Sequence, residues 1–510
     1  MNPRSVLSLC VFSALATVGV AQPGAPVQRL PRSHPEAEGV SAAGILEFVT
    51  AADSRFNTLN SYMLVRHGKV VAEGWWGPYS ADEPHWLYSL SKSFTSTAEG
   101  LAIAEGKLSL DDQVIKFFPE DAPASPSENL KMLRVRDLIT MTTGHEASVL
   151  EDFEYFTKDS PVKRFLSFPV SHKPGTMFVY NSPGTMTQAA IVQKVTGQNV
   201  HDYLQTRLFE PLGFGNPHWS TTAQGVTIGN SELWIRTEDI AVFGQMLLQK
   251  GNWNGMQLVP SAWIEEATAK QVSNGSKPSS DWDQGYGYQF WRCRPGFYRA
   301  DGAFGQFCFV MPQYDAVLVL TAGCNDTQGI MNLVYDKVLP ALHTDALPED
   351  SAGDAALQRV SAGLTIHSPH AEGSSPLAAQ FTGRTYVFPD NKRHIRSITL
   401  QSAGETTQIV ITGDGYDGAP ITVGHRDWVR GHTDFGSDIN PVEPIIEDEP
   451  VAAIGGWATP DTFVVKLCYY RTPYTLSIQL QFGGSLVVLN GDYNVSFKPN
   501  ALPQLVGRAP

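Results

Sequence analysis

The chain has 510 residues, of which 42% are hydrophobic and 17% are charged, and its formal net charge at pH 7 is −14. This length and apolar content suffice for two or three domains, each with its own hydrophobic core. The acidic balance and the lack of any lysine or arginine run exclude the basic surface on which nucleic-acid binding depends. We therefore expect a globular protein that has no nucleic-acid partner.

The first 21 residues have the features of a secretory signal peptide. They carry one basic residue, Arg4, an apolar run too short to span a bilayer, and the small residues Gly19 and Ala21 where cleavage would occur. An N-terminal core helix is the alternative, but a Gln-Pro-Gly sequence ends the run as a processing junction would. No later stretch is apolar enough for a membrane span. We expect residues 1–21 to be removed and the mature protein to be secreted or periplasmic.

An exported protein is able to form disulfides. Four cysteines lie outside the signal peptide, namely Cys293, Cys308, Cys324 and Cys468. Their spacing matches no zinc-site pattern. The sequence leaves open whether any pair forms a disulfide, and free buried thiols are at least as good an interpretation.

The predicted elements of the first 345 residues begin and end with strands. A helix is predicted at 42–56, and two strands follow within 61–76, around a His-Gly turn. The middle is helical, with amphipathic patterns at 201–209 and 237–250. Strand patterns return at 285–292, 305–312 and 316–323. This order favours one sheet that is assembled from both ends of the segment, with a helical insert between them.

A domain boundary is predicted between residues 346 and 378, where proline, glycine, serine and acidic residues mark a linker. Short alternating strands separated by turn residues follow. In the segment 475–482, Leu476, Ile478, Leu480 and Phe482 share one face, so one side of that strand is buried and the other faces water. An antiparallel barrel or sandwich fits this pattern best.

A polar turn opens the helix predicted for "YSLSKSFTSTAEGLAIA". Positions i and i+3 of a helix face the same way, so Ser89 and Lys92 point together. A serine hydroxyl becomes a strong nucleophile when a base takes its proton, and burial lowers the pKa of a lysine enough for it to be that base. The positive end of the helix dipole also favours developing negative charge. Taken alone, the four residues could instead be an ordinary helix cap.

The Ser-x-x-Lys pattern occurs a second time, from Ser160 to Lys163. A proline follows the serine there, as at the N-cap and first positions of a helix. We interpret this second match as a cap and not as a nucleophile.

Two further segments carry groups that a serine nucleophile needs. Tyr180 and Ser182 lie in a turn before a predicted helix, and a tyrosine beside a lysine can be held partly deprotonated and relay protons to a leaving group. Gly302 and Gly305 precede a late strand, where glycine lets a backbone N–H approach a ligand and donate to an oxyanion. Alone, the tyrosine is equally a core residue, and the glycines are better explained by a bulge or turn.

Together, Ser-Leu-Ser-Lys at 89–92, Tyr-Asn-Ser at 180–182 and Ala-Asp-Gly at 300–302 resemble the three motifs of the serine β-lactamase and penicillin-binding-protein-like family, most closely its class C and esterase-like branch. The resemblance implies an α/β fold, a β-lactamase/transpeptidase-like sandwich whose antiparallel sheet is flanked by helices, with a helical subdomain. It also implies an acyl-enzyme mechanism without metal or organic cofactor. We expect the hydrolase domain at 30–345, the linker at 346–378, and a β-rich domain, a lipocalin-like barrel or a sandwich, at 379–510.

Carried over position by position, the resemblance makes Ser89 the nucleophile, Lys92 the base that activates it and Tyr180 the proton relay. Ser182 stands where the family more usually has asparagine. The oxyanion hole would consist of the backbone N–H groups of Ser89 and Ala303, next to Gly302.

The third motif departs from the family at Ala300, where β-lactam-recognising members carry a lysine or histidine that helps hold the substrate carboxylate. Arg299 would compensate only if its side chain faced the same way, which strand alternation disfavours. We therefore expect an esterase or amidase acting on a small ester, amide or peptide, and keep a β-lactamase or D-Ala-D-Ala carboxypeptidase as the alternative. A non-catalytic ligand-binding protein on the same fold is the alternative from another class. The natural substrate, the role of the β-rich domain and the oligomeric state stay open.

Two other patterns carry no chemistry. "GDGYDG" at 413–418 fits a dinucleotide-binding fingerprint, but it leads into another strand where that motif requires a helix, so we predict a hairpin turn. No G-x-S-x-G elbow is present, so an α/β-hydrolase triad would have no nucleophile.

Overall fold

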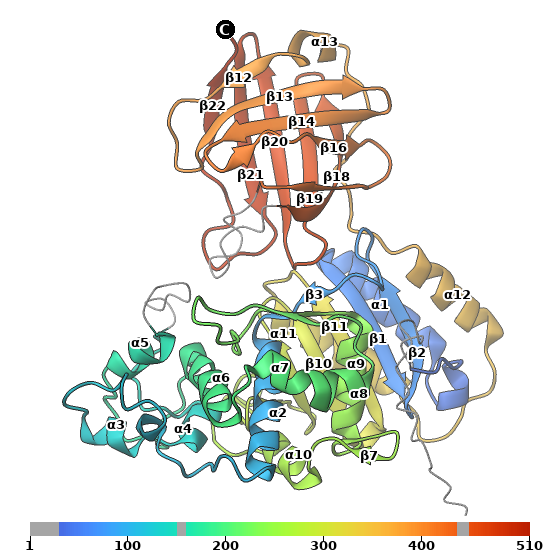
Figure 1. The fold of residues 1–510 in the computed structure, drawn as a ribbon. Helices are drawn as coiled ribbons and strands as arrows, with labels where there is room; N and C mark the ends of the chain where they lie inside the picture. The colour runs from blue at the N-terminus through green and yellow to red at the C-terminus, as the bar shows by residue number, and fades with distance from the viewer. Residues whose placement is uncertain (1–29, 150–159, 436–447) are drawn as a thin grey trace, which may run out of the picture.

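The computed structural model describes residues 30–149, 160–435 and 448–510. The predicted signal peptide lies outside these ranges. Within them, the chain forms an α/β domain followed by a β-barrel (Figure 1). No helix of the described ranges is long and apolar enough to cross a membrane.

An antiparallel sheet of six strands forms the centre of the first domain, in the order β2-β1-β11-β10-β9-β8. Its strands are β1 (Leu59–Arg66), β2 (Lys69–Trp75), β8 (Trp291–Arg292), β9 (Tyr298–Gly302), β10 (Gln306–Met311) and β11 (Ala316–Ala322). β1 pairs with β11 and places Met63 opposite Val319. The prediction that both ends of the segment build one sheet is therefore confirmed.

Helices cover both faces of this sheet and form a helical region beside it (Figure 1). They are α1 (Ala42–Phe56), α2 (Ser91–Ala104), α3 (Glu128–Met132), α4 (Val135–Ile139), α5 (Pro161–Ser167), α6 (Ser182–Thr196), α7 (Val200–Leu204), α8 (Glu210–Leu212), α9 (Thr237–Leu248), α10 (Ser261–Thr268) and α11 (Thr327–Leu333). The pattern predicted as one helix at 201–209 is split, because α7 passes into a π-helical turn, Gln205–Phe209. Two small sheets complete the domain, one of β3 (His85–Trp86), β5 (Leu233–Ile235) and β4 (His218–Trp219), the other of β6 (Asn252–Trp253) and β7 (Met256–Gln257).

Alternate residues of the central strands face two separate cores. Met63 and Val319 belong to a core that also contains residues of α2 and α9. Leu64 and Leu318, one position away, belong to a core that contains residues of α1 and α11. The alternation holds α2 firmly against one face of the sheet.

The strand predicted at 285–292 is wrong for most of its length, since only Trp291 and Arg292 are in a strand. Its alternating aromatic residues are buried, as a strand would bury them. However, Gln289 has a left-handed φ of 66°. The N–H of Gly287 donates to the carbonyl of Phe290 at 2.8 Å and closes a turn. Periodicity alone does not separate a buried turn from a buried strand.

The segment predicted as a linker contains a helix, α12 (Ser351–Ala362). The Asp350 side chain caps its first turn by accepting from the N–H of Gly353. Its buried Leu357 packs in the core that α1 shares with the sheet. The Tyr62 and Ser361 hydroxyls are joined by a hydrogen bond of 2.6 Å. This part of the segment is thus fixed to the first domain.

The C-terminal region is a closed barrel, because β13 pairs with both β12 and β14 at the two ends of the strand path. The strands of the ring are β12 (Thr385–Val387), β13 (Ile395–Ala403), β14 (Thr406–Gly413), β16 (Ile421–Gly424), β18 (Glu449–Thr459), β19 (Thr462–Cys468), β20 (Thr475–Gly483), β21 (Leu486–Tyr493) and β22 (Leu505–Arg508). A short helix, α13 (Ala378–Phe381), precedes it. Outside the ring, β17 (Val429–Thr433) pairs with β18, and β15 (Tyr416–Asp417) forms the predicted hairpin with β14. Closure removes most of the unpaired edges that an open sheet would expose.

Candidate active site

Ser89 lies in a 3-10 turn, Tyr88–Leu90, that runs directly into α2. We expected it inside the first turn of the α-helix, and the structure places it just before that turn. The i and i+3 side chains of a 3-10 turn also lie one above the other, so Ser89 and Lys92 still point together. Lys92 Nζ donates to Ser89 Oγ at 2.7 Å.

Lys92 is held in a site that favours its neutral form. Only 1% of the side chain is exposed, and its Nζ makes a second hydrogen bond of 2.7 Å to the carbonyl of Asn230. Burial lowers the pKa of Lys92 well below its ordinary value, and the Asp301 carboxylate opposes that shift. A neutral amine next to a hydroxyl has a lone pair that can accept its proton. Asn230 could not be found by sequence reasoning, because it lies 138 residues from Lys92 and acts through its backbone carbonyl.

The other serines near Ser89 have different roles. Ser91 is fully buried, and its Oγ accepts from the N–H of Leu233 at 3.3 Å. Ser93 Oγ donates to the carbonyl of Gln289 at 2.8 Å. Ser160 caps α5, as predicted, by accepting from the N–H of Lys163. Of these four serines, Ser89 is the one whose hydroxyl is hydrogen-bonded to a lysine side chain.

Tyr180 lies beside both groups. Its ring stacks on Trp291 with centroids 5.4 Å apart, and Lys92 Nζ lies 5.1 Å from the centroid of the Tyr180 ring. Burial raises the pKa of Tyr180, although a hydrogen bond with Ser89 opposes the shift. Burial thus favours the protonated phenol and opposes the partly deprotonated tyrosine that we expected. In the resting site Tyr180 is a phenol that can donate a proton.

Asn181, the middle residue of the second motif, was not among the predicted site residues. Ser182 is buried and begins α6. Asn181 is fully buried, and neither polar atom of its side-chain amide has a hydrogen-bond partner among the described residues. Leaving a buried amide unpaired is costly, so Asn181 is a candidate for contact with a ligand or an ordered water. Sequence reasoning missed Asn181 although it lies within the Tyr-Asn-Ser motif, and Ser182 stays the predicted counterpart of the family's asparagine.

The third motif touches the Ser89 turn through Gly302, the last residue of β9. A Cβ atom on Gly302 would lie 2.1 Å from the carbonyl oxygen of Leu87, so only glycine allows this approach. Ala303 follows in a tight turn, and Gly305 completes the turn with a φ of 101°. The two N–H groups predicted for the oxyanion hole, those of Ser89 and Ala303, thus belong to two backbone segments in direct contact.

Arg299 and Ala300 face opposite sides of β9, as strand alternation predicts. Ala300 is fully buried in the core of the α2 face. The Arg299 guanidinium lies 4.6 Å from the ring centroid of Trp282, and its Nε donates to the Asp301 carboxylate at 2.7 Å. Burial raises the pKa of Asp301 to about 6, against the opposing effect of Arg299. Arg299 therefore does not supply the charge that Ala300 lacks.

The described residues show no grouping of side chains that is typical of a metal site. No three His, Cys, Asp or Glu side chains of this part of the chain are grouped so that they could hold a metal ion. The four cysteines within the described ranges are buried and free.

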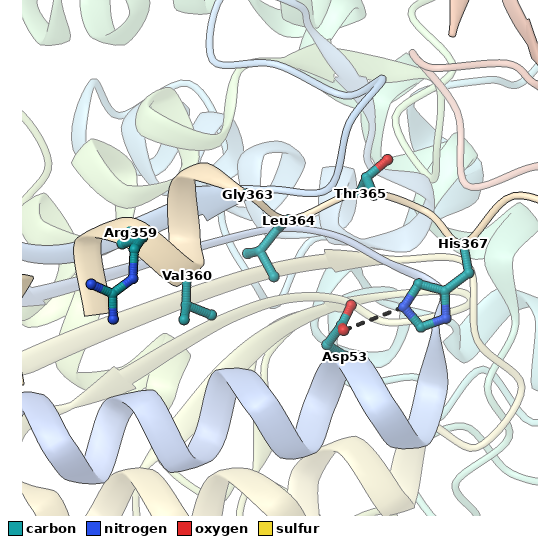
Figure 2. Close-up of a pocket in the computed structure, with 7 residues that line it drawn as sticks. All are labelled: Asp53, Arg359, Val360, Gly363, Leu364, Thr365 and His367. Atoms are coloured by element: carbon teal, nitrogen blue, oxygen red, sulfur yellow. Dashed lines mark hydrogen bonds and ion pairs between the residues drawn. The ribbon is translucent and has the colours of Figure 1, made fainter. Parts of the chain in front are cut away.

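A separate surface pocket lies between the end of α1 and the segment after α12 (Figure 2). Asp53 Oδ2 faces His367 Nε2 at 3.3 Å, and Asp53 Oδ1 accepts from Trp76 Nε1 at 2.8 Å. The contact between Asp53 and His367 therefore ties the segment after α12 to α1. None of the three motifs lines it.

The chain is similar to proteins of a known family. A model of the family described as Beta-lactamase matches residues 60–332, which is more than half of the chain. The 6-aminohexanoate-dimer hydrolase of Paenarthrobacter ureafaciens is 25% identical over 328 residues, covering 60% of this chain and 83% of that protein. Lovastatin esterase of Penicillium rubens is 26% identical over 186 residues, covering 32% of this chain and 45% of the esterase. A solved Bacillus anthracis structure has a TM-score of 0.53 at 21% identity, covering 63% of this chain and 89% of that one, which concerns the fold alone.

Proposed function

Because this chain belongs to the β-lactamase family of hydrolases, we propose that it is a serine hydrolase that cleaves esters or amides through an acyl-serine intermediate. One observation carries the proposal above the others. Lys92 Nζ lies 2.7 Å from Ser89 Oγ, and the lysine is buried in a site that lowers its pKa. A buried lysine without such a function would be an expensive feature of a protein core.

In the proposed reaction, Ser89 Oγ attacks the substrate carbonyl carbon as its proton passes to Lys92 Nζ. The N–H groups of Ser89 and Ala303 donate to the oxyanion that forms. Tyr180 gives its phenolic proton to the departing alkoxide or amine, and the bond from carbon to the leaving group breaks. The proton on Lys92 then restores the phenol. A water molecule attacks the acyl-serine in the second half, releasing the acid and returning a proton to Ser89.

The substrate preference that we propose is for short neutral esters or uncharged amides. Ala300 provides no charge for a substrate carboxylate, and the Arg299 guanidinium is occupied by Asp301. The Asp301 carboxylate acts on Lys92 and Tyr180, so a second carboxylate bound near them would be repelled. Losing an interaction with a charged group is worth about 1.5 to 3 kcal/mol, or roughly one to two powers of ten in affinity. The esterase among the relatives named above is consistent with the ester part of this preference.

The proposal is tested with three substrates of matched detection, namely p-nitrophenyl butyrate, butyryl p-nitroanilide and nitrocefin. We expect kcat/KM for the butyrate ester to exceed that for nitrocefin by at least about tenfold. A preference for nitrocefin would make the protein a β-lactamase. A protein that turns over none of the three and forms no covalent adduct would instead be the non-catalytic ligand-binding protein.

Export through the segment 1–21 is a second part of the proposal, and it rests on the sequence alone. N-terminal sequencing of the protein recovered outside the cytoplasm should begin at or close to Gln22. A mature protein that retains Met1 would contradict it.

A further inference from the structure

The barrel reaches the candidate active site through aromatic side chains. One core cluster contains Trp86, Tyr88 and Phe304 of the first domain together with Tyr474 and other residues of the barrel. The hydroxyls of Tyr88 and Tyr474 are hydrogen-bonded to each other. The N–H of Trp86 donates to the carbonyl of Arg471 at 2.8 Å. The barrel therefore packs against the segment that leads into Ser89, and Figure 1 shows the barrel next to β3 of the first domain.

Two residues of this cluster flank the predicted oxyanion hole. Tyr88 directly precedes Ser89, and Phe304 directly follows Ala303. Both have a left-handed backbone, with φ of 48° for Tyr88 and 65° for Phe304, and their rings meet edge to face at 5.5 Å. Residues other than glycine in that conformation are strained, and such strain gathers at functional sites.

Phe497 lies on these two rings from the barrel side. It belongs to the loop between β21 and β22, and its ring centroid is 4.7 Å from that of Phe304 and 5.9 Å from that of Tyr88. It is nevertheless 68% exposed, the highest value among the exposed large apolar side chains of the described residues. An aromatic ring that is anchored on one side and open on the other offers an apolar surface to a ligand.

The chemistry decides which part of a substrate would meet this surface. In the proposed reaction the leaving group faces Tyr180, and the oxyanion faces the N–H groups of Ser89 and Ala303. Tyr180 packs with Trp291 in an aromatic cluster distinct from the one of Tyr88 and Phe304, whose rings Phe497 contacts. The remaining substituent of the reacting carbon is the acyl chain, and the aromatic surface beside the oxyanion hole is the one left for it.

We propose that Phe497 forms one wall of an apolar subsite for the acyl chain, so that the barrel completes the active site of the first domain. This inference rests on the proposed function. The subsite selects substrates whose acyl chain is long enough to cover the Phe497 ring, and an acetyl group is too short to do so. Each methylene group that is removed from water contributes about fourfold to kcat/KM.

The test uses the full-length protein and p-nitrophenyl esters that share one leaving group, the acetate, butyrate and hexanoate. We expect the butyrate-to-acetate ratio of kcat/KM to be well above one in the natural protein, to fall at least about threefold in Phe497→Ala, and to fall less in Phe497→Leu. Val506→Ala is the matched control, since Val506 is an exposed apolar residue of the barrel, 47% exposed on β22. It should leave the ratio unchanged. Thermal unfolding of each variant checks that the barrel stays folded.

An unchanged ratio in Phe497→Ala overturns the subsite. Equal losses for acetate and butyrate also overturn it, because they would mean that Phe497 supports the backbone and does not contact the acyl chain. The same assays on Ser89→Ala separate this inference from the proposed function. If Ser89→Ala stays active the proposed function fails, whereas a dead Ser89→Ala with an unchanged Phe497→Ala ratio removes only the subsite.

Discussion

Replacing Gly302 by alanine should disable the site without removing any chemical group from it. The new Cβ would lie 2.1 Å from the Leu87 carbonyl oxygen, which is a backbone atom and cannot rotate away. Restoring an ordinary contact of 3.4 Å requires the end of β9 and the Ser89 turn to separate by about 1.3 Å. A misplacement of about 1 Å costs roughly 10² in rate, because the N–H of Ala303 no longer meets the oxyanion. The overpacking itself should cost about 1 to 3 kcal/mol of stability.

The assay compares kcat/KM for p-nitrophenyl butyrate and the melting temperature of Gly302→Ala with those of Gly431→Ala. Gly431 lies on β17, where an added Cβ meets nothing within 4 Å and the backbone is not left-handed, so this control changes glycine to alanine without a clash. We expect the first variant to lose about a hundredfold and the second to keep its activity. A Gly302→Ala protein that retains more than about a third of its activity would refute the close-approach reasoning and, with it, the assignment of the third motif to the oxyanion hole.

Three further outcomes are expected. In Asp301→Asn, loss of the carboxylate lowers the pKa of Lys92 further, so the rising acidic limb of the kcat/KM profile should move to lower pH. The exposed control Asp336→Asn should leave that limb in place. A move of the limb to higher pH in Asp301→Asn would contradict the electrostatic account. Burial raises the pKa of Glu99 well above its ordinary 4.5, so the folded state holds a proton that the unfolded state releases, and the free energy of unfolding should fall as pH rises above about 4.5. Urea titrations of Glu99→Gln at several pH values should show a smaller fall. An equal dependence of the unfolding free energy on pH in both proteins would be the contrary result. Ala300→Lys should raise the ratio of nitrocefin turnover to p-nitrophenyl butyrate turnover by roughly tenfold, with some loss of stability because the position is buried. The control Ala300→Met should leave the ratio unchanged. Equal ratios in the two variants would show that Ala300 does not set substrate preference.

The chemistry of the site was predictable where it depends on local spacing. Ser89 and Lys92 are three residues apart, and that spacing places their side chains together in any helical turn. The alternation that sends Arg299 and Ala300 to opposite faces of β9 is equally local. Sequence reasoning also separated Ser89 from Ser160, since a proline at the next position marks a cap.

Contacts between distant segments were not predictable in the same way. The carbonyl of Asn230 that holds Lys92 has no signature in the sequence, because every residue has a carbonyl. The protonation state of Tyr180 follows from burial, which depends on Trp291 and Tyr286 packing around it. The local pattern of apolar residues contains no information on the Asn230 contact or on the burial of Tyr180.

The fold shows the same division. The strands predicted within 61–76 and at 305–312 and 316–323 correspond to β1, β2, β10 and β11, because apolar residues dominate these segments and turn residues separate them. The helix at 351–362 was missed because its side chains are mostly small or polar and form no clear apolar pattern. The packing of Leu357 against the first domain stabilises this helix, and that contact is not visible in the sequence. The contact of Phe497 with Tyr88 and Phe304 joins residues hundreds of positions apart, so only the assembled chain reveals it.

The central claim is that Ser89 forms a covalent acyl intermediate. The most direct measurement is intact mass followed by peptide mapping after exposure of the full-length protein to a fluorophosphonate. The account predicts one adduct per chain, located on Ser89, which is lost in Ser89→Ala and kept in Ser91→Ala. An adduct on another residue, or none in the natural protein while it still hydrolyses p-nitrophenyl butyrate, would contradict it.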